Sequence, residues 1–159
     1  MTGRWKLELL RRIVAFVIAE ALMVLLGSAA HSFRVQQAWS GAAGSAAGAG
    51  PAPIPFVDRL SWAAHDLGGM FLPYAGVTSI ALLIAFLVAG LLARFIGYRV
   101  VVFGIAGATA ILVTFITMRM TLGTVGIFGA RGPSGLAAQM TVGLIAGVLF
   151  ARLSARRAS

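Results

Sequence analysis

The residue with the clearest potential for chemistry is Glu20, an acid near the middle of the apolar run from Arg11 to His31. Inserting a charged acid at the centre of a membrane helix costs roughly 2.5–3.5 kcal/mol, and the surrounding apolar residues return about 3–5 kcal/mol in all. Such acids usually face the interior of a bundle and often mark a functional path. Two interpretations stay open: a neutral structural acid, or a site for a proton, a cation or a partner subunit.

Two polar residues of later runs are candidates to meet Glu20. At a rise of 1.5 Å per residue, Glu20 lies about 10 Å into its run and Thr109 about 13 Å into the third, so they match in depth. Gln139 lies in the fourth run and can hydrogen-bond across a helix contact. No basic residue of the chain is expected at this depth. Glu20 is therefore either protonated, because desolvation favours the neutral carboxyl, or paired with a second chain or a transported cation.

A second candidate group lies outside the apolar runs, where His65 stands between Asp58 and Asp66 and could be joined by His31. Two His and two Asp are enough to ligate a metal or relay a proton. No close ligand spacing such as HxxxH is present, however, and the chain has no Cys. The sequence therefore predicts no metal and no cofactor.

The composition indicates a chain that is solvated by lipid. It is 60% hydrophobic and 11% charged, whereas soluble domains are nearer half apolar and a quarter charged. The net charge of +9 could suggest nucleic acid, but the basic residues stand at the ends of apolar runs, as membrane anchors do. The predicted partners are the bilayer and other membrane subunits or copies of the chain, with no nucleic acid.

Four apolar runs approach the 20 residues that a membrane-spanning helix needs, at about 13–30, 72–93, 100–118 and 135–152. The sequence therefore predicts one integral membrane domain, an all-α bundle of four transmembrane helices.

The distribution of Lys and Arg predicts the orientation of this bundle. With the N-terminus inside, nine basic residues fall on the inner side and four on the outer side. The positive-inside rule then places both termini in the cytoplasm, in an inner membrane. The first run also resembles a cleavable secretory signal ending near Ser28 to Ala30, but the acid within it favours a retained helix.

The segments outside the membrane are expected to differ from each other. Residues 31–55 are rich in Ala, Gly, Ser and Pro and predict a flexible outer loop. Residues 56–67 have helical periodicity and predict an interfacial amphipathic helix, with Trp62 at headgroup level and His65 on the polar side. Arg119 and Arg131 are expected at the same outer interface.

A line of small residues in the fourth run predicts close helix packing. Gly143, Gly147 and Ala151 follow Gln139 at intervals of four, so all share one helix face. Small residues let helix backbones approach closely, within a chain or between copies.

Three classes of function follow. We favour a non-enzymatic accessory or assembly subunit that packs against other membrane subunits or copies. The alternative is a small transporter or channel in which Glu20 carries a proton or cation, although no internal repeat of the kind found in transporters is evident. A membrane enzyme using His31 and His65 would need converging groups that the spacing does not predict.

Overall fold

The chain folds into long helices joined by short connections. The computed structural model describes residues 4–124 and 128–155. Its helices are α1 (Arg4–Ala46), α2 (Phe56–Ile96), α3 (Arg99–Leu122), the 3-10 turn η1 (Phe128–Ala130) and α4 (Pro133–Leu153). Those residues contain no strand. The all-α prediction is thus confirmed for the described part of the chain.

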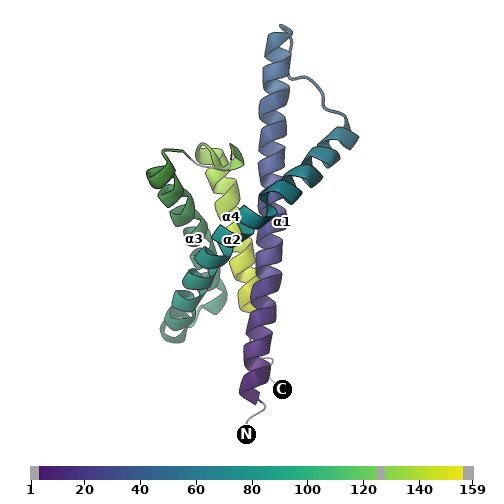
Figure 1. Cartoon of the computed structure of the whole chain (residues 1–159). Helices are drawn as coiled ribbons and strands as arrows, with labels where there is room; N and C mark the ends of the chain where they lie inside the picture. The colour runs from purple at the N-terminus through teal and green to yellow at the C-terminus, as the bar shows by residue number, and fades with distance from the viewer. Residues whose placement is uncertain (1–3, 125–127, 156–159) are drawn as a thin grey trace.

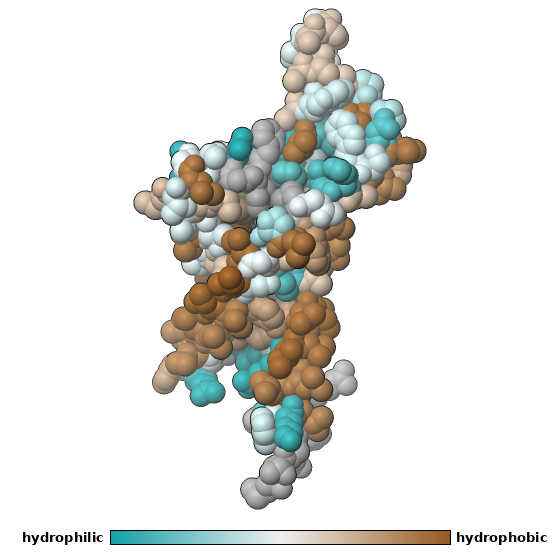
Figure 2. Space-filling view, viewed as in Figure 1, coloured by the Kyte–Doolittle hydropathy of each residue, from teal (hydrophilic) through white to brown (hydrophobic). Residues whose placement is uncertain are grey.

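Four of these helices are long and apolar enough to cross a membrane. Apolar side chains cover much of the middle of the visible bundle, whereas polar side chains gather towards its upper part and again towards its lower end (Figure 2). This architecture is compatible with a multi-pass membrane protein.

The bundle has two distinct ends. The start of α1, the end of α4 and the connection between α2 and α3 lie at one end, which we call the terminal end (Figure 1). The connections from α1 to α2 and from α3 to α4 lie towards the other end, the loop end. The turn between α2 and α3 is only two residues long, and Gly97 adopts a φ of 84° there, which a residue with a Cβ rarely adopts.

Helix α1 continues well beyond the predicted first span. Its 43 residues correspond to about 64 Å, twice the thickness of the hydrocarbon core. The prediction of a flexible loop over residues 31–55 was therefore wrong for 31–46, which are helical. The Ala-rich composition permits a helix, and hydrogen bonds to the following segment stabilise it: Gln36 Nε2 donates to the carbonyl of Arg59 at 3.0 Å, and the Ser40 hydroxyl donates to the carbonyl of Ala52.

The predicted interfacial helix over 56–67 is helical, but it is not a separate element. Gly68 and Gly69 do not end it, and α2 continues through Pro73 to Ile96. Its first turns pack against the extension of α1, where Trp62 and Trp39 form an edge-to-face pair with ring centroids 5.5 Å apart. Residues 31–46 and 56–70 thus form a helical hairpin beyond the bundle, the loop-end hairpin (Figure 1).

The small residues of α4 are used within the chain. A Cβ on Gly147 would overlap the carbonyl oxygen of Phe103, and one on Gly107 would overlap that of Gly143. Helices α3 and α4 therefore pack backbone against backbone, as the small-residue pattern predicted. Ala151, the last member of that line, is also buried.

An aromatic cluster fills the bundle towards the terminal end. Phe86 stacks on Phe150 with ring centroids 4.6 Å apart, and Phe103 lies 5.1 Å from Phe150. Phe16 of α1 meets Phe86 edge to face at 6.2 Å. These four rings, the phenylalanine cluster, join all four long helices.

Candidate functional site

Polar side chains form a line through the interior of the bundle, along the contacts of α1 with α2 and α4. We call this line the polar seam. Its side chains are Glu20, Ser28, Ser32, Asp66, Tyr74, Thr78 and Gln139. All are buried except Asp66, which is half-buried. Buried polar groups are costly unless they are hydrogen-bonded, so the bonds of this seam decide what it can do.

Glu20 is 9% exposed and meets Thr78 of α2. The Thr78 hydroxyl lies 2.6 Å from Glu20 Oε1 and 2.8 Å from the carbonyl oxygen of Tyr74, one turn earlier in its own helix. The other carboxyl oxygen, Oε2, is buried without a hydrogen-bond partner. The acid is thus turned into the bundle, as the sequence predicted, and half of its bonding capacity is unused.

Tyr74 and Gln139 form the next level of the seam towards the loop end. The tyrosine hydroxyl donates to Gln139 Oε1 at 2.7 Å, and Gln139 Nε2 donates to the carbonyl of Gly27 at 3.0 Å. A Cβ on Gly27 would overlap the tyrosine hydroxyl, so glycine is needed for this approach. Two hydrogen bonds thereby connect α2, α4 and α1.

The seam ends in polar contacts at the base of the loop-end hairpin. The Ser32 hydroxyl donates to Asp66 Oδ2. The neighbouring His31 Nδ1 accepts the backbone N–H of Gly129 at 3.0 Å, which holds η1 against α1. Because Nδ1 is an acceptor here, its imidazole is neutral with the proton on Nε2. The first contact joins the two arms of the hairpin at its base, and the second holds η1 against that base.

The suggested metal or proton site is not assembled as a set of four residues, although His31 lies close enough to Asp66 for the two to interact electrostatically. His65 is exposed, whereas His31 is occupied by its bond to η1. Within residues 4–124 and 128–155, no three His, Asp or Glu side chains lie together as metal ligands would.

The remaining predicted residues fall in different places. Thr109 is exposed on α3 and does not reach Glu20; the hydroxyl that does so is Thr78. Trp62 stacks on Trp39 in the loop-end hairpin. Arg119 lies exposed in the last turn of α3, and Arg131 lies between η1 and α4.

Sequence reasoning missed the α2 side of the seam. Tyr74 and Thr78 are four residues apart on one helix face, and both are buried. On α1, the polar residues Ser28, Ser32, Gln36 and Ser40 also recur every four residues, a signal that the sequence contained. The line of i, i+4 polar residues is typical of one helix face, and it predicts a contact that continues beyond the apolar run.

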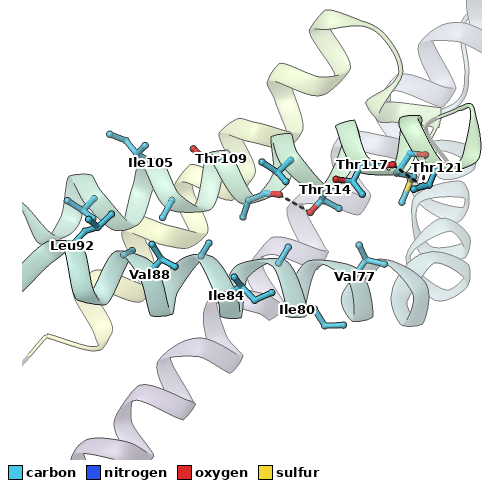
Figure 3. A pocket seen from close by; sticks show the side chains of 18 of the residues that line it. Val77, Ile80, Ile84, Val88, Leu92, Ile105, Thr109, Thr114, Thr117 and Thr121 are labelled. Carbon is cyan, nitrogen blue, oxygen red and sulfur yellow. Dashed lines mark hydrogen bonds between the residues drawn. The ribbon is translucent and has the colours of Figure 1, made fainter.

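A groove of about 930 Å³ lies between α2 and α3, on the outside of the bundle. Figure 3 shows the two helices side by side, with aliphatic side chains and threonines lining the space between them. We call it the α2–α3 groove. The α2 residues Ala81, Ala85 and Ala89, together with Ala106 and Ala110 of α3, are its small residues.

Two of the four threonines that line the groove direct their hydroxyls to their own helix. Thr114 donates to the carbonyl of Ala110 at 2.8 Å, and Thr121 donates to that of Thr117 at 2.9 Å. Hydroxyls that bond to their own helix present mainly their methyl groups to a neighbour. The groove is therefore suited to an apolar occupant.

Arginines close the terminal end of the bundle. Arg99 Nη2 donates to Ser154 Oγ at 2.6 Å, and Arg11 Nη2 donates to the Ser154 carbonyl at 3.4 Å. The Arg99 guanidinium also lies 4.8 Å from the centre of the Phe103 ring. Cations at the C-terminus of a helix stabilise its dipole, so these side chains cap α4.

No protein-family model, no curated protein and no solved structure matches this chain.

Proposed function

We propose that the chain is a non-enzymatic, multi-pass inner-membrane protein, an accessory or assembly subunit that packs against a transmembrane helix of another membrane subunit. The observation that carries this proposal is the open, apolar α2–α3 groove.

The length of the groove favours a transmembrane helix, rather than a lipid tail, as its occupant. Its α3 wall extends from Val102 to Thr121, which is about 28 Å at the helical rise. The hydrocarbon core is about 30 Å thick, so the groove matches a complete span. The acyl chain of one lipid reaches only through its own leaflet.

The residues of the groove also favour a helix. Ala81, Ala85 and Ala89 recur every four residues on α2, opposite Ala106 and Ala110 of α3. Larger side chains on both sides, such as Ile84 and Ile105, leave a channel between them. In lipid, helix association depends on close packing of this kind rather than on the hydrophobic effect.

The polar seam supports a structural role in place of catalysis or permeation. Tyr74, Gln139 and Thr78 are bonded to each other or to backbone within the bundle, away from the groove. Towards the terminal end, the seam meets the phenylalanine cluster, which offers no polar group to continue a path. A transporter that uses Glu20 is the second candidate, favoured by its unpartnered Oε2.

The orientation belongs to the same proposal. Lys6, Arg11, Arg12, Arg94, Arg99 and Arg152 belong to the terminal end, and Arg34, Arg59, Arg119 and Arg131 to the loop end. This bias supports a cytoplasmic terminal end.

A variant that fills the groove tests the proposal. Thr109 is exposed and lines the groove, so Thr109→Trp places a large side chain in it without entering the core. We expect the wild-type chain, extracted from its native membrane in mild detergent, to carry a stoichiometric membrane subunit that the variant loses.

Val17→Trp is the matched control, because Val17 is exposed on α1 away from the groove. This control should keep the partner. If both variants retain the same partner as the wild type, or if the wild type purifies alone, the groove is not a subunit interface. A partner that proves to be a second copy would place the contact between copies of this chain.

A further inference from the structure

The hydrogen bonds around Glu20 indicate where a proton lies. The Thr78 hydroxyl has one hydrogen and two close oxygens, Glu20 Oε1 at 2.6 Å and the Tyr74 carbonyl at 2.8 Å. If the carboxyl is ionised, Thr78 can donate fully to only one of them. If the carboxyl is protonated on Oε1, it donates to Thr78 Oγ1, and Thr78 donates to Tyr74. Only the protonated acid satisfies both contacts.

The surroundings of the carboxyl also favour the neutral acid. No cationic side chain is bonded to it in the described part of the chain; its neighbours from α2 are Thr78, Ser79 and Tyr74. The one titratable residue of α4, Arg152, lies at its far terminal end, and η1 contains none. An unpaired charge buried here would be strongly destabilising.

The carboxyl nevertheless keeps a capacity to exchange its proton. Glu20 Oε2 and Ser28 Oγ are both buried without partners. They belong to residues about 12 Å apart along α1, and Ser32 follows about 6 Å further on. In proteins, buried polar groups of this kind are commonly satisfied by a buried water. Beyond Ser32 lie Asp66 and His31, the titratable groups nearest the loop end of the seam.

Towards the terminal end, α1 carries no polar side chain between Glu20 and Arg12, and the next buried polar atom without a partner is Arg11 Nε, in a residue about 14 Å away along the helix. Ala15, Ala19 and the phenylalanine cluster lie between Glu20 and the terminal end, and Ala15 and Ala19 are fully buried. We propose that Glu20 is a proton-binding site that exchanges protons with the loop end of the bundle and not with the terminal end. A hydronium ion at the loop end supplies the proton: one of its O–H bonds breaks as the O–H bond of the carboxyl forms, and a water molecule is left. This inference does not depend on a partner in the groove.

Infrared spectroscopy of the chain in liposomes tests the resting state. We expect a carbonyl band of a protonated carboxylic acid at neutral pH that is lost in Glu20→Gln and kept in Asp58→Asn, whose acid is exposed. Thr78→Val removes the bonding partner and should shift that band upward, whereas Thr78→Ser should leave it in place. A wild-type spectrum without such a band, or one unchanged by both Glu20→Gln and Thr78→Val, would overturn the proposal.

Labelling with dicyclohexylcarbodiimide, which modifies protonated carboxyls in apolar surroundings, tests the direction of access. In oriented vesicles we expect an adduct on Glu20, and a rate that falls at least tenfold when the medium at the loop end is made alkaline. The same change at the terminal end should leave the rate unaltered. Equal sensitivity to both faces, or sensitivity to the terminal face alone, would contradict one-sided exchange.

Discussion

Among single residues, the best-defined contact is the one that Tyr74 makes between two helices. Its hydroxyl satisfies Gln139, which in turn holds the Gly27 carbonyl. The sequence identified Glu20 and Gln139 as polar residues inside the bundle, and both are buried. Thr109 rather than Thr78 was predicted as the partner of Glu20, because depth along a helix can be counted from the sequence. The direction in which a side chain faces depends instead on how each helix is rotated about its axis.

Removing the tyrosine hydroxyl should destabilise the bundle. Tyr74→Phe leaves Gln139 Oε1 buried without its donor, at a cost of about 1–3 kcal/mol in the free energy of unfolding. Denaturant titration in detergent micelles measures this loss. Tyr98→Phe, at an exposed tyrosine of the α2–α3 turn, should change it by less than about 0.5 kcal/mol. Equal losses of unfolding free energy in the two variants would show that the buried Tyr74–Gln139 hydrogen bond contributes nothing to stability.

At the scale of elements, the four apolar runs predicted the four long apolar helices, because length and hydropathy are local properties of a sequence. The helical extension of α1 was missed because its Ala, Gly and Ser residues are also typical of linkers. What decides the conformation is the contact with α2, through Gln36 and the Trp39–Trp62 pair, and with the preceding connection, through Ser40 and Ala52. The packing of Gly143 and Gly147 was predicted, but the sequence did not identify α3 as the partner.

Two glycine substitutions should have opposite effects on the free energy of unfolding. Gly147→Ala forces a Cβ onto the Phe103 carbonyl and should cost about 1–3 kcal/mol through overpacking. Gly90→Ala meets only the Phe103 ring at 3.8 Å and should gain up to about 1 kcal/mol from helix propensity. The measurement is again the free energy of unfolding in micelles. A Gly147→Ala variant as stable as the wild type would contradict the close α3–α4 contact.

The loop-end hairpin can be tested by spin labels, since the chain has no cysteine of its own. Single cysteines placed along residues 33–46 should give water accessibility that oscillates with a period of about 3.6 residues. Positions that face α2, such as Gln36 and Ser40, should be the least mobile. Uniformly high mobility along the segment would contradict the helix and would support the flexible loop that the composition predicted.

At the scale of the whole molecule, the two ends of the bundle differ in their number of basic residues, and the positive-inside rule then predicts a cytoplasmic terminal end. Cysteines at Tyr98 in the α2–α3 turn and at Ser45 in the loop-end hairpin should therefore react with impermeant thiol reagents from opposite faces. Both positions are exposed. We expect Ser45→Cys to react from outside intact cells and Tyr98→Cys only after the membrane is opened. Reaction of both from one face would exclude this arrangement.

The most direct test of the account is the identity of what occupies the α2–α3 groove. Photoreactive labels on single cysteines at Ile80, Ile84 and Val88 face the groove, whereas labels at Val14, Val17 and Leu25 of α1 are exposed elsewhere. In native membranes we predict that the groove positions cross-link to one protein partner, with an intensity that Thr109→Trp abolishes, and that the α1 positions give lipid adducts. Lipid adducts alone at all six positions would contradict the proposal that this chain is a subunit packed through its groove.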